Sequence, residues 1–220
     1  MAKKTIRGIL ITFEGSEGCG KSTQSRLLYR YLKDKGYPVI YLREPGDTRV
    51  GEKIRKILLD PRNEITSLGE TLLYMTARAE LVYKVIQPAL RQGRIVICDR
   101  FLDSTFAYQG YGLGVELKVI RFLGKLVTLG IKPDLTIFLD LPVKKCLEKR
   151  KPIKDRIERR SYRYHIRVRK GYLRLVLQDP ERIKLVKVDK DKKRTQQKIR
   201  EIVNSFLLKW HGSFPDKRTR

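Results

Sequence analysis

The sequence predicts an α/β fold, in which helices cover both faces of a five-stranded parallel sheet. The first observation is that short apolar runs alternate along the chain with longer segments of helical pattern. The second is that these runs are rich in branched apolar residues, as is typical of parallel strands buried on both faces. There are no repeats and no long linker, so residues 1–220 are expected to form a single domain.

Each strand is predicted from one apolar run, and each helix from the segment that follows. The expected strands are Ile6–Glu14, Val39–Leu42, Arg94–Asp99, Leu135–Asp140 and Ile183–Val188. The expected helices are Lys21–Lys35, Val50–Leu59, Glu70–Gln92, Glu116–Leu129, Pro142–Lys149, Tyr162–Leu177 and Thr195–Trp210. A polar break separates Pro142–Lys149 from Tyr162–Leu177, and the tail, residues 212–220, is expected to be flexible.

The composition indicates a globular protein of the cytoplasm. The chain is 41% apolar and 34% charged, and no apolar stretch approaches the ~20 residues of a membrane span. The first residues, M-A-K-K-T-I-R, lack an apolar signal segment. The cysteines Cys19, Cys98 and Cys146 are odd in number and have no metal-like spacing, which favours reduced thiols.

The net charge of +26 allows two interpretations. Fifty basic residues stand against twenty-four acidic ones, and much of the excess lies in Lys149–Lys170 and Lys190–Arg194. Such a balance can indicate nucleic-acid binding. It can also accompany phosphate handling in a lineage that is rich in lysine and arginine. We favour the second interpretation, because no nucleic-acid-binding motif accompanies the charge.

A phosphate-binding motif lies between the first strand and the first helix. Residues Gly15–Ser22, G-S-E-G-C-G-K-S, match the P-loop pattern G-x-x-x-x-G-K-[ST]. Backbone N–H groups and the helix N-terminus would hold a phosphate, Lys21 would supply a positive charge, and the Ser22 hydroxyl suits Mg²⁺. The motif specifies the fold further, as the P-loop NTPase fold. The residues expected around the triphosphate of ATP are Gly15, Ser16, Glu17, Gly18, Cys19, Gly20, Lys21, Ser22 and Thr23.

Polar residues follow the other strands at the edge where ligands bind in such sheets. R-E-P-G-D-T (Arg43–Thr48) follows the second strand, and a polar segment that begins with Asp99 and Arg100 follows the third. Because parallel strands end at one edge, these residues are expected beside the P-loop. Two arginines there indicate a second anion, which is the arrangement of a kinase whose acceptor is itself a phosphate.

At this point the chain resembles the thymidylate kinase family over nearly its whole length. R-E-P-G-D-T-R-V-G-E-K-I-R (Arg43–Arg55) resembles the family signature R-E-P-G-G-T, and D-R-F-L-D-S-T-F-A-Y-Q-G (Asp99–Gly110) resembles a second one. L-L-Y-M-T-A-R-A-E-L-V, P-D-L-T-I-F-L-D and D-R-I-E follow in family order. The resemblance implies transfer of the γ-phosphate of ATP to dTMP with Mg²⁺, in a homodimer.

The resemblance also implies roles for the residues at the strand ends. Arg43 and Arg100 would bind the dTMP phosphate, since a guanidinium fork matches its oxygens. Asp99 would hold Mg²⁺ through water beside Ser22. Glu17 would meet the sugar 3′-OH. A solvated loop arginine is the alternative for Arg43, but its position at a strand end before E-P-G favours phosphate binding. The alternative for Asp99 is a loop cap.

Base recognition is implied to come from the helix Glu70–Gln92 and the segment after the third strand. Tyr74 matches the family aromatic that stacks on thymine, and Arg78 matches the residue that bonds a thymine carbonyl. By helical spacing alone, Tyr74 is a core residue and Arg78 a surface charge. The remaining residues implied at the acceptor are Ser104, Thr105, Tyr108 and Gln109.

The catalytic arginine is expected in a short lid of residues 149–160. Members of the family carry an arginine either in the P-loop or in the lid, and here the loop position is Gly18. Arg150 and Arg156 are the first candidates, ahead of Arg159 and Arg160. Together with Lys21 and Arg100, the first two form the expected catalytic set.

Two other functions compete with dTMP phosphorylation. One is a related P-loop kinase that acts on another nucleotide or on a deoxynucleoside, and the R-E-P-G and A-Y-Q-G segments argue against it. The other is a nucleic-acid-binding relative that has lost kinase activity. The charge supports that alternative, but Lys21, Ser22, Asp99 and Arg100 are all in place.

Overall fold

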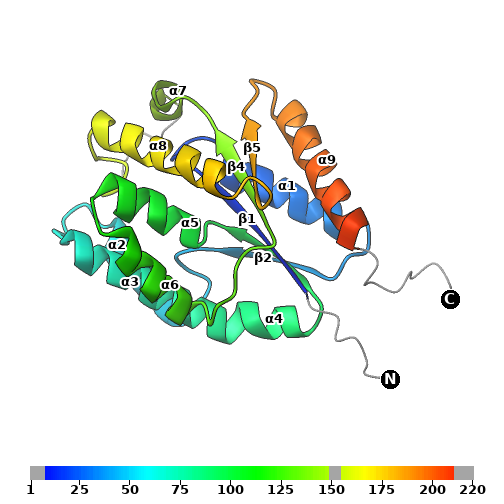
Figure 1. The fold of residues 1–220 in the computed structure, drawn as a ribbon, viewed down its shortest axis with the longest axis horizontal. Coiled ribbons are helices and arrows are strands. Elements are labelled where there is room, and N and C mark those ends of the chain that lie inside the picture. The colour runs from blue at the N-terminus through cyan, green and yellow to red at the C-terminus, as the bar shows by residue number, and fades with distance from the viewer. Residues whose placement is uncertain (1–7, 149–154, 211–220) are drawn as a thin grey trace.

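A single parallel sheet forms the centre of the molecule. The computed structural model describes residues 8–148 and 155–210. The strand order is β2-β3-β1-β4-β5, and every neighbouring pair is parallel, which confirms the predicted sheet (Figure 1). The strands are β1 (Ile9–Gly15), β2 (Val39–Arg43), β3 (Ile95–Asp99), β4 (Leu135–Asp140) and β5 (Ile183–Lys187).

Helices occupy the connections between the strands and close the chain. They are α1 (Lys21–Asp34), α2 (Arg49–Leu59), α3 (Ser67–Leu81), α4 (Gln87–Arg91), α5 (Leu102–Thr105), α6 (Leu117–Val127), α7 (Val143–Glu148), α8 (Tyr162–Gln178) and α9 (Lys192–Trp210). Two π-helical segments are η1 (Val82–Ile86) and η2 (Phe106–Gly112). No helix in residues 8–148 or 155–210 is long and apolar enough to cross a membrane.

The structure corrects two predicted elements. The helix expected over residues 70–92 begins earlier, at Ser67, and consists of α3, η1 and α4. Its wide π-helical turn precedes Pro88, which lacks the N–H group needed to continue the α-helical bonding. The segment after β3, for which we predicted no helix, forms α5 and η2. Gly110 and Gly112 have low helix propensity but lie against Leu117 and Tyr164, so packing outweighs propensity here.

The core lies on both faces of the sheet because side chains alternate along each strand. Ile9, Ile11 and Phe13 pack with residues of α1 and α9. Leu10, on the opposite face of β1, packs with residues of η1 and α4. Figure 1 shows α1 and α9 on one side of the sheet and α3, α4 and α6 on the other.

The strand register brings the ends of β1, β2 and β3 to one edge. Asp99 is level with Phe13 on one side and with Arg43 on the other. The residues that follow these strands therefore meet, as the sequence predicts. The expected lid is described only from Asp155 onward, and Arg150 lies outside the described residues, as does the whole predicted tail, residues 212–220.

Candidate active site

The phosphate loop runs from the end of β1 into the start of α1. Gly15, Gly18 and Gly20 have φ angles of 144°, 79° and 96°, a region that side chains other than glycine rarely adopt. At Gly15 a Cβ atom would also lie 2.6 Å from the Leu139 carbonyl oxygen. Gly20 is the N-cap of α1 and has no side chain to bond the first amide groups, which leaves them to an anion.

The loop lysine and the two expected metal ligands are held in place. Lys21 is buried, and its Nζ donates to the Ser16 carbonyl oxygen at 2.8 Å. The Ser22 hydroxyl donates to Oδ2 of Asp99, so neighbouring strands bring together two residues that are far apart in the sequence. In the described part of the chain, no group of three or more His, Cys, Asp or Glu residues could hold a metal. Mg²⁺ in phosphoryl-transfer sites uses one or two protein ligands together with substrate phosphates, which Ser22 and Asp99 match.

The Cys19 side chain is a packing residue of the loop. Its thiol is buried, and burial raises its pKa, so it stays protonated. It packs into the cluster that β1 and α1 form. The geometry therefore agrees with a small tolerated residue rather than a nucleophile.

Arg100 is the centre of the acceptor side. It has a φ of 78°, which is unusual for a residue with a side chain and typical of strain at functional sites. Its Nη2 donates to Glu17 Oε1 at 2.6 Å and to the Tyr108 hydroxyl at 3.0 Å, while Nη1 donates to Ser104 Oγ at 2.9 Å. Burial lowers its pKa, but Glu17, Tyr108, Tyr172 and Glu14 together outweigh this effect, so the net pKa is raised. Four predicted site residues thus form one network around a permanent positive charge.

Glu14 supports this network and was not predicted. Its buried carboxylate accepts from the Phe101 N–H at 2.8 Å, from Ser104 Oγ at 2.6 Å and from the Tyr172 hydroxyl at 2.8 Å. Burial, followed by the charge of Asp103, raises its pKa to about 7. A glutamate inside an apolar strand is the one sequence signal that could have identified it. It fixes the backbone directly after Arg100.

Two further arginines lie close to Arg100. Arg43 pairs with Glu52 at 2.7 Å, and its buried Nε has no hydrogen-bond partner among the described residues. Arg55 Nη1 donates to the Pro45 carbonyl oxygen at 3.0 Å. Burial lowers the pKa of Arg55, and the charges of Arg43 and Arg100 lower it further, so Arg55 lies within reach of both other guanidinium groups. Such a group favours a bound anion, and the role of Arg55 was missed.

Asp47 stands where the family signature has glycine. Its φ is 57°, in the left-handed region that aspartate tolerates better than most residues. Its carboxylate accepts from the Arg43 backbone N–H at 2.6 Å, and its own N–H donates to Glu52 at 2.9 Å. The substitution therefore keeps the turn that carries Arg43.

Arg78 lies beneath the site rather than at its surface. It is 1% exposed, and its Nε is 2.6 Å from Glu44 Oε1. Its Nη2 donates to the Phe101 carbonyl oxygen at 3.2 Å, so it holds the residue that follows Arg100. Burial raises the pKa of Glu44 to about 7, and the charge of Arg78 opposes that rise. The acidic partner of Arg78 was not predicted, although it belongs to the R-E-P-G segment.

The remaining base-pocket residues come from α3 and η2. Tyr74 is half-buried, and burial raises the pKa of its hydroxyl. The charges of Glu70 and Glu17 raise this pKa further, whereas the charge of Arg100 lowers it. Thr105 is 1% exposed, and its hydroxyl has no hydrogen-bond partner among the described residues. Gln109 Nε2 donates to Glu70 Oε1 at 2.8 Å, so it bonds to the protein rather than opening toward a ligand.

The described part of the lid is anchored to α2 and α3. Arg156 donates to the Leu58 carbonyl oxygen at 2.8 Å and pairs with Glu70 at 2.5 Å. Arg160 pairs with the same carboxylate at 2.6 Å. Glu70 is fully buried, and sequence reasoning missed it. The contacts described for Arg156 are thus with α2 and α3 and not with the phosphate loop.

Comparison with known proteins places this geometry in a family. The family model described as thymidylate kinase matches residues 13–199. That span includes the phosphate loop, both arginine segments and α8. This chain belongs to the thymidylate kinase family.

Similar proteins and a similar solved structure support membership of the thymidylate kinase family. The thymidylate kinase of Caldanaerobacter subterraneus is 48% identical over 182 residues, which cover 82% of this chain and 88% of that protein. The thymidylate kinase of Halothermothrix orenii is 43% identical and covers 93% of this chain and 100% of that protein. The crystal structure of thymidylate kinase from Ehrlichia chaffeensis matches with a TM-score of 0.76 at 34% identity, over 90% of this chain and 99% of that one.

Proposed function

We propose that the residues gathered at the ends of β1, β2 and β3 transfer the γ-phosphate of ATP to dTMP. Family membership supports the reaction, since a thymidylate kinase phosphorylates dTMP to dTDP with ATP as donor. One observation carries the assignment of the site. Arg100 bonds to Glu17 of the phosphate loop at 2.6 Å, and the charges of Arg100 and Arg43 both act on Arg55, so a second group of positive charges adjoins the loop. A site with two anion-binding halves suits the transfer of a phosphoryl group between two phosphates.

The phosphate loop is proposed to bind ATP. The segment Gly15–Thr23 would hold the phosphates through backbone N–H groups, and Lys21 would neutralise charge on the transferred group. Ser22 and Asp99 would hold Mg²⁺, whose chemistry when bound is to neutralise phosphate charge. No general base is needed, because the acceptor phosphate oxygen is already ionised.

The opposite half is proposed to bind dTMP. Arg43, Arg55 and Arg100 would bind its phosphate, and Glu17 would turn to the sugar 3′-OH. Tyr74 would stack on the base, and Tyr108 would close over the deoxyribose. The Thr105 hydroxyl, which has no hydrogen-bond partner among the described residues, would bond to a polar group of the base. Arg78 would reach a thymine carbonyl through Nη1, whose one acceptor among the described residues is the weak acceptor Sδ of Met75 at 3.4 Å. Ser104 and Gln109 would position these groups.

A panel of acceptors tests the proposed function. We expect dTMP to give the highest kcat/KM, followed by dUMP, with the ribonucleotide TMP much poorer. Loss of the 5-methyl group is expected to cost ~1–3 kcal/mol, as for a methylene-sized change in a pocket. A coupled assay of ADP release measures each acceptor. Equal kcat/KM for dTMP, CMP and AMP would contradict the proposed acceptor.

The lid is proposed to supply a catalytic arginine. Members of the family that lack an arginine in the phosphate loop carry one in the lid, and the corresponding position of this loop is Gly18. Arg150→Ala and Arg156→Ala are expected to lower kcat more than they weaken dTMP binding, since the charge they meet is largest in the transition state. Steady-state kinetics together with dTMP titration separate the two effects. Lys145→Ala, in α7, is the matched control. If kcat is unchanged in both variants and in the double variant, another group supplies the charge.

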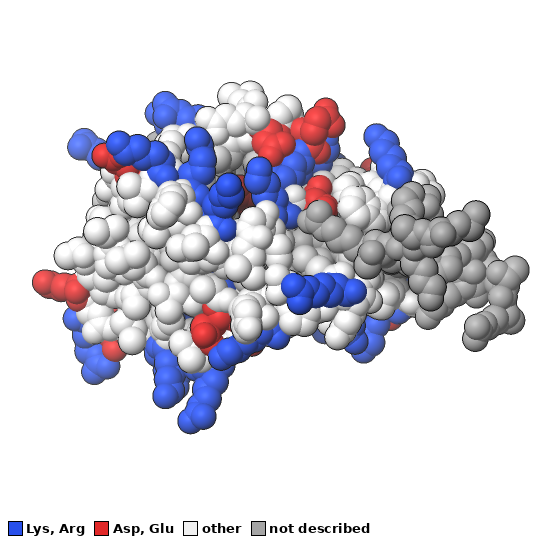
Figure 2. Space-filling view, turned by 60° about the horizontal axis from the view of Figure 1, so that its bottom comes forward, with Lys and Arg blue, Asp and Glu red and all other residues white. Residues whose placement is uncertain are grey.

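We also propose that the protein acts as a homodimer in the cytoplasm, as one domain. Exposed apolar side chains lie on α2, α3 and α6, which pack side by side. They include Leu68 at 52%, Phe122 at 71% and Leu126 at 63% exposure. Figure 2, which turns the side with α3, α4 and α6 forward, shows a broad area without charged side chains, with Lys and Arg around it. The basic residues are scattered on this view rather than gathered into one nucleic-acid-binding patch.

Charge on this face is expected to separate the subunits. Phe122→Glu with Leu126→Glu should give a monomer at concentrations where the unmodified protein is a dimer, because two carboxylates cannot be buried there without partners. Light scattering after size-exclusion chromatography measures the mass. Leu177→Glu is the control, since Leu177 is 81% exposed on α8, outside this face. A dimeric double variant would place the interface elsewhere.

A further inference from the structure

A cavity of about 490 Å³ lies away from the phosphate loop. Its walls are α5, η2, α6 and the loop 128–133, together with the end of α8 and Arg182, which precedes β5. Because β4 and β5 begin directly after this loop and after Arg182, the cavity is at the amino ends of these strands. The phosphate loop follows the carboxyl end of β1, so the two sites lie at opposite edges of the parallel sheet.

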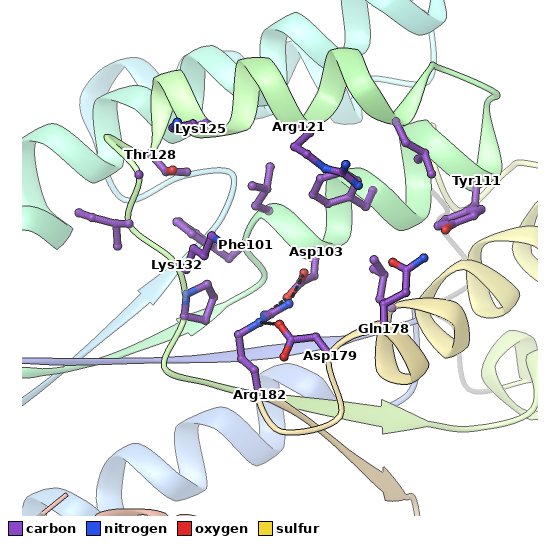
Figure 3. A pocket seen from close by; sticks show the side chains of 17 residues that line it. Phe101, Asp103, Tyr111, Arg121, Lys125, Thr128, Lys132, Gln178, Asp179 and Arg182 are labelled. Carbon is purple, nitrogen blue, oxygen red and sulfur yellow. Dashed lines mark hydrogen bonds and ion pairs between the residues drawn. The ribbon is translucent and has the colours of Figure 1, made fainter.

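One side of the cavity carries positive charges without partners. Arg121 and Lys125 come from α6, and Lys132 comes from the following loop. All three are exposed, and none of their side chains forms an ion pair or hydrogen bond with another residue in the described ranges 8–148 and 155–210. Figure 3 shows Arg121 extending from α6 toward the interior of the cavity. This side therefore attracts an anion.

On the other side of the cavity, the positive charge of Arg182 is neutralised by two carboxylates, which also hold the side chain in place. Arg182 pairs with Asp103 at 2.6 Å and with Asp179 at 2.7 Å, and it donates to Thr136 Oγ1 at 2.9 Å (Figure 3). These partners hold the Arg182 guanidinium between two carboxylates. The lining has four cationic and two carboxylate side chains, so the excess of positive charge lies with Arg121, Lys125 and Lys132.

The floor of the cavity is apolar and partly aromatic. It includes Phe101, Leu102, Phe106, Ile131 and Pro133. The volume falls within the ~300–1,000 Å³ that is typical of small-molecule sites, which combine apolar walls with a few polar groups. A bare inorganic anion would leave this apolar surface in contact with water. An apolar molecule without charge would leave the basic residues unused.

We propose that this cavity is a second binding site, which takes a small aromatic anion. The flat body of the ligand would lie on the apolar floor, and its phosphate, sulfonate or carboxylate group would face Arg121, Lys125 and Lys132. The site is independent of the proposed transfer reaction. Its α5 wall carries Ser104, which bonds to Arg100, so the occupant would contact the back of the acceptor site.

Binding of 8-anilino-1-naphthalenesulfonate to enzyme saturated with dTMP and ADP tests the proposal. With the nucleotide sites filled, we expect one further equivalent of this aromatic sulfonate to bind. Arg121→Glu with Lys125→Glu should weaken that binding by about tenfold or more, because like charges then face the sulfonate. Both side chains are exposed, so the variant should keep the Tm of the unmodified protein. Lys118→Glu is the matched control, since Lys118 is on the same helix but does not line the cavity.

Competition then defines the chemistry of the ligand. Phenyl phosphate should displace the probe, whereas inorganic phosphate or phenol at the same concentration should not. No binding to the saturated enzyme, or equal binding by the charge-reversed variant, would overturn the site. Equal displacement by inorganic phosphate would overturn the aromatic class.

Discussion

Replacement of Lys21 with alanine is expected to lower kcat by about a hundredfold or more and to leave the protein folded. Lys21 lies in the loop between β1 and α1, with its Nζ buried beside the Ser16 carbonyl oxygen. From that position it meets charge that moves during phosphoryl transfer, and such contacts are worth about 3 kcal/mol in the transition state. Steady-state kinetics with dTMP and ATP measure the loss.

The control for this variant is Lys33→Ala, an exposed lysine on the same helix. It should change kcat by less than about twofold, as expected for a surface charge remote from the reaction. Circular dichroism and thermal unfolding show whether each variant is folded. A folded Lys21→Ala variant with kcat close to that of the unmodified enzyme would rule out the proposed role of the loop.

Replacement of Arg78 with methionine is expected to destabilise the fold by about 3–5 kcal/mol, because it leaves the Glu44 carboxylate buried without a counter-charge. Both side chains are 1% exposed, and their atoms approach to 2.6 Å. Urea unfolding measures the free energy. A loss of this size would show that Arg78 stabilises the fold from beneath the site, in addition to its proposed contact with the thymine.

The loss should depend on pH in a defined direction. The pKa of Glu44 is about 7 in the folded protein, compared with 4.5 as its ordinary value. At a pH between these two pKa values, Glu44 keeps its proton in the folded protein but releases it in the unfolded chain. Glu44 therefore makes the free energy of unfolding fall as pH rises. The charge of Arg78 lowers the pKa of Glu44 in the folded protein, so removal of Arg78 extends this pH range upward. The variant should therefore lose more stability than the unmodified protein between about pH 5 and about pH 8.

A second substitution separates the buried charge from the lost packing. Glu44→Gln in the Arg78→Met background removes the unpaired carboxylate, so it should restore part of the stability and remove the added pH dependence. The single Glu44→Gln variant is the control. If the Arg78→Met variant shows the pH dependence of the unmodified protein, the Glu44 carboxylate is not the source of the loss.

The features of the fold and site that could be predicted from the sequence are those that depend on patterns within short stretches of chain. Five apolar runs predicted five strands, and the order of residues after each strand predicted that Arg100 and Asp99 would meet the phosphate loop. The register confirms this meeting, since Asp99 is level with Arg43 and Phe13. Periodicity and the parallel topology were sufficient because both act over short stretches of chain.

The missed residues act through partners that are far apart in the sequence. Glu14 bonds to Ser104, 90 positions away, and Glu70 pairs with Arg156, 86 positions away. No local pattern marks such a pair. The place of Glu14 in an apolar strand indicates burial but not its partner, and Glu70 alone has the pattern of an ordinary charged helix residue. The helical form of α5 and η2 was missed for the same reason. Their glycines favour a loop, and only packing against α6 and α8 makes them helical.

The contact between Glu17 and Arg100 has a consequence for how the acceptor arrives. In this structure, the Arg100 guanidinium bonds to the Glu17 carboxylate at 2.6 Å. A phosphate that enters would exchange with this carboxylate rather than meet an unpaired charge. Glu17 would then leave Arg100 when the phosphate binds, and it would be released beside the sugar that it is proposed to bind. The affinity for the acceptor would therefore measure how much better a phosphate satisfies Arg100 than a carboxylate does.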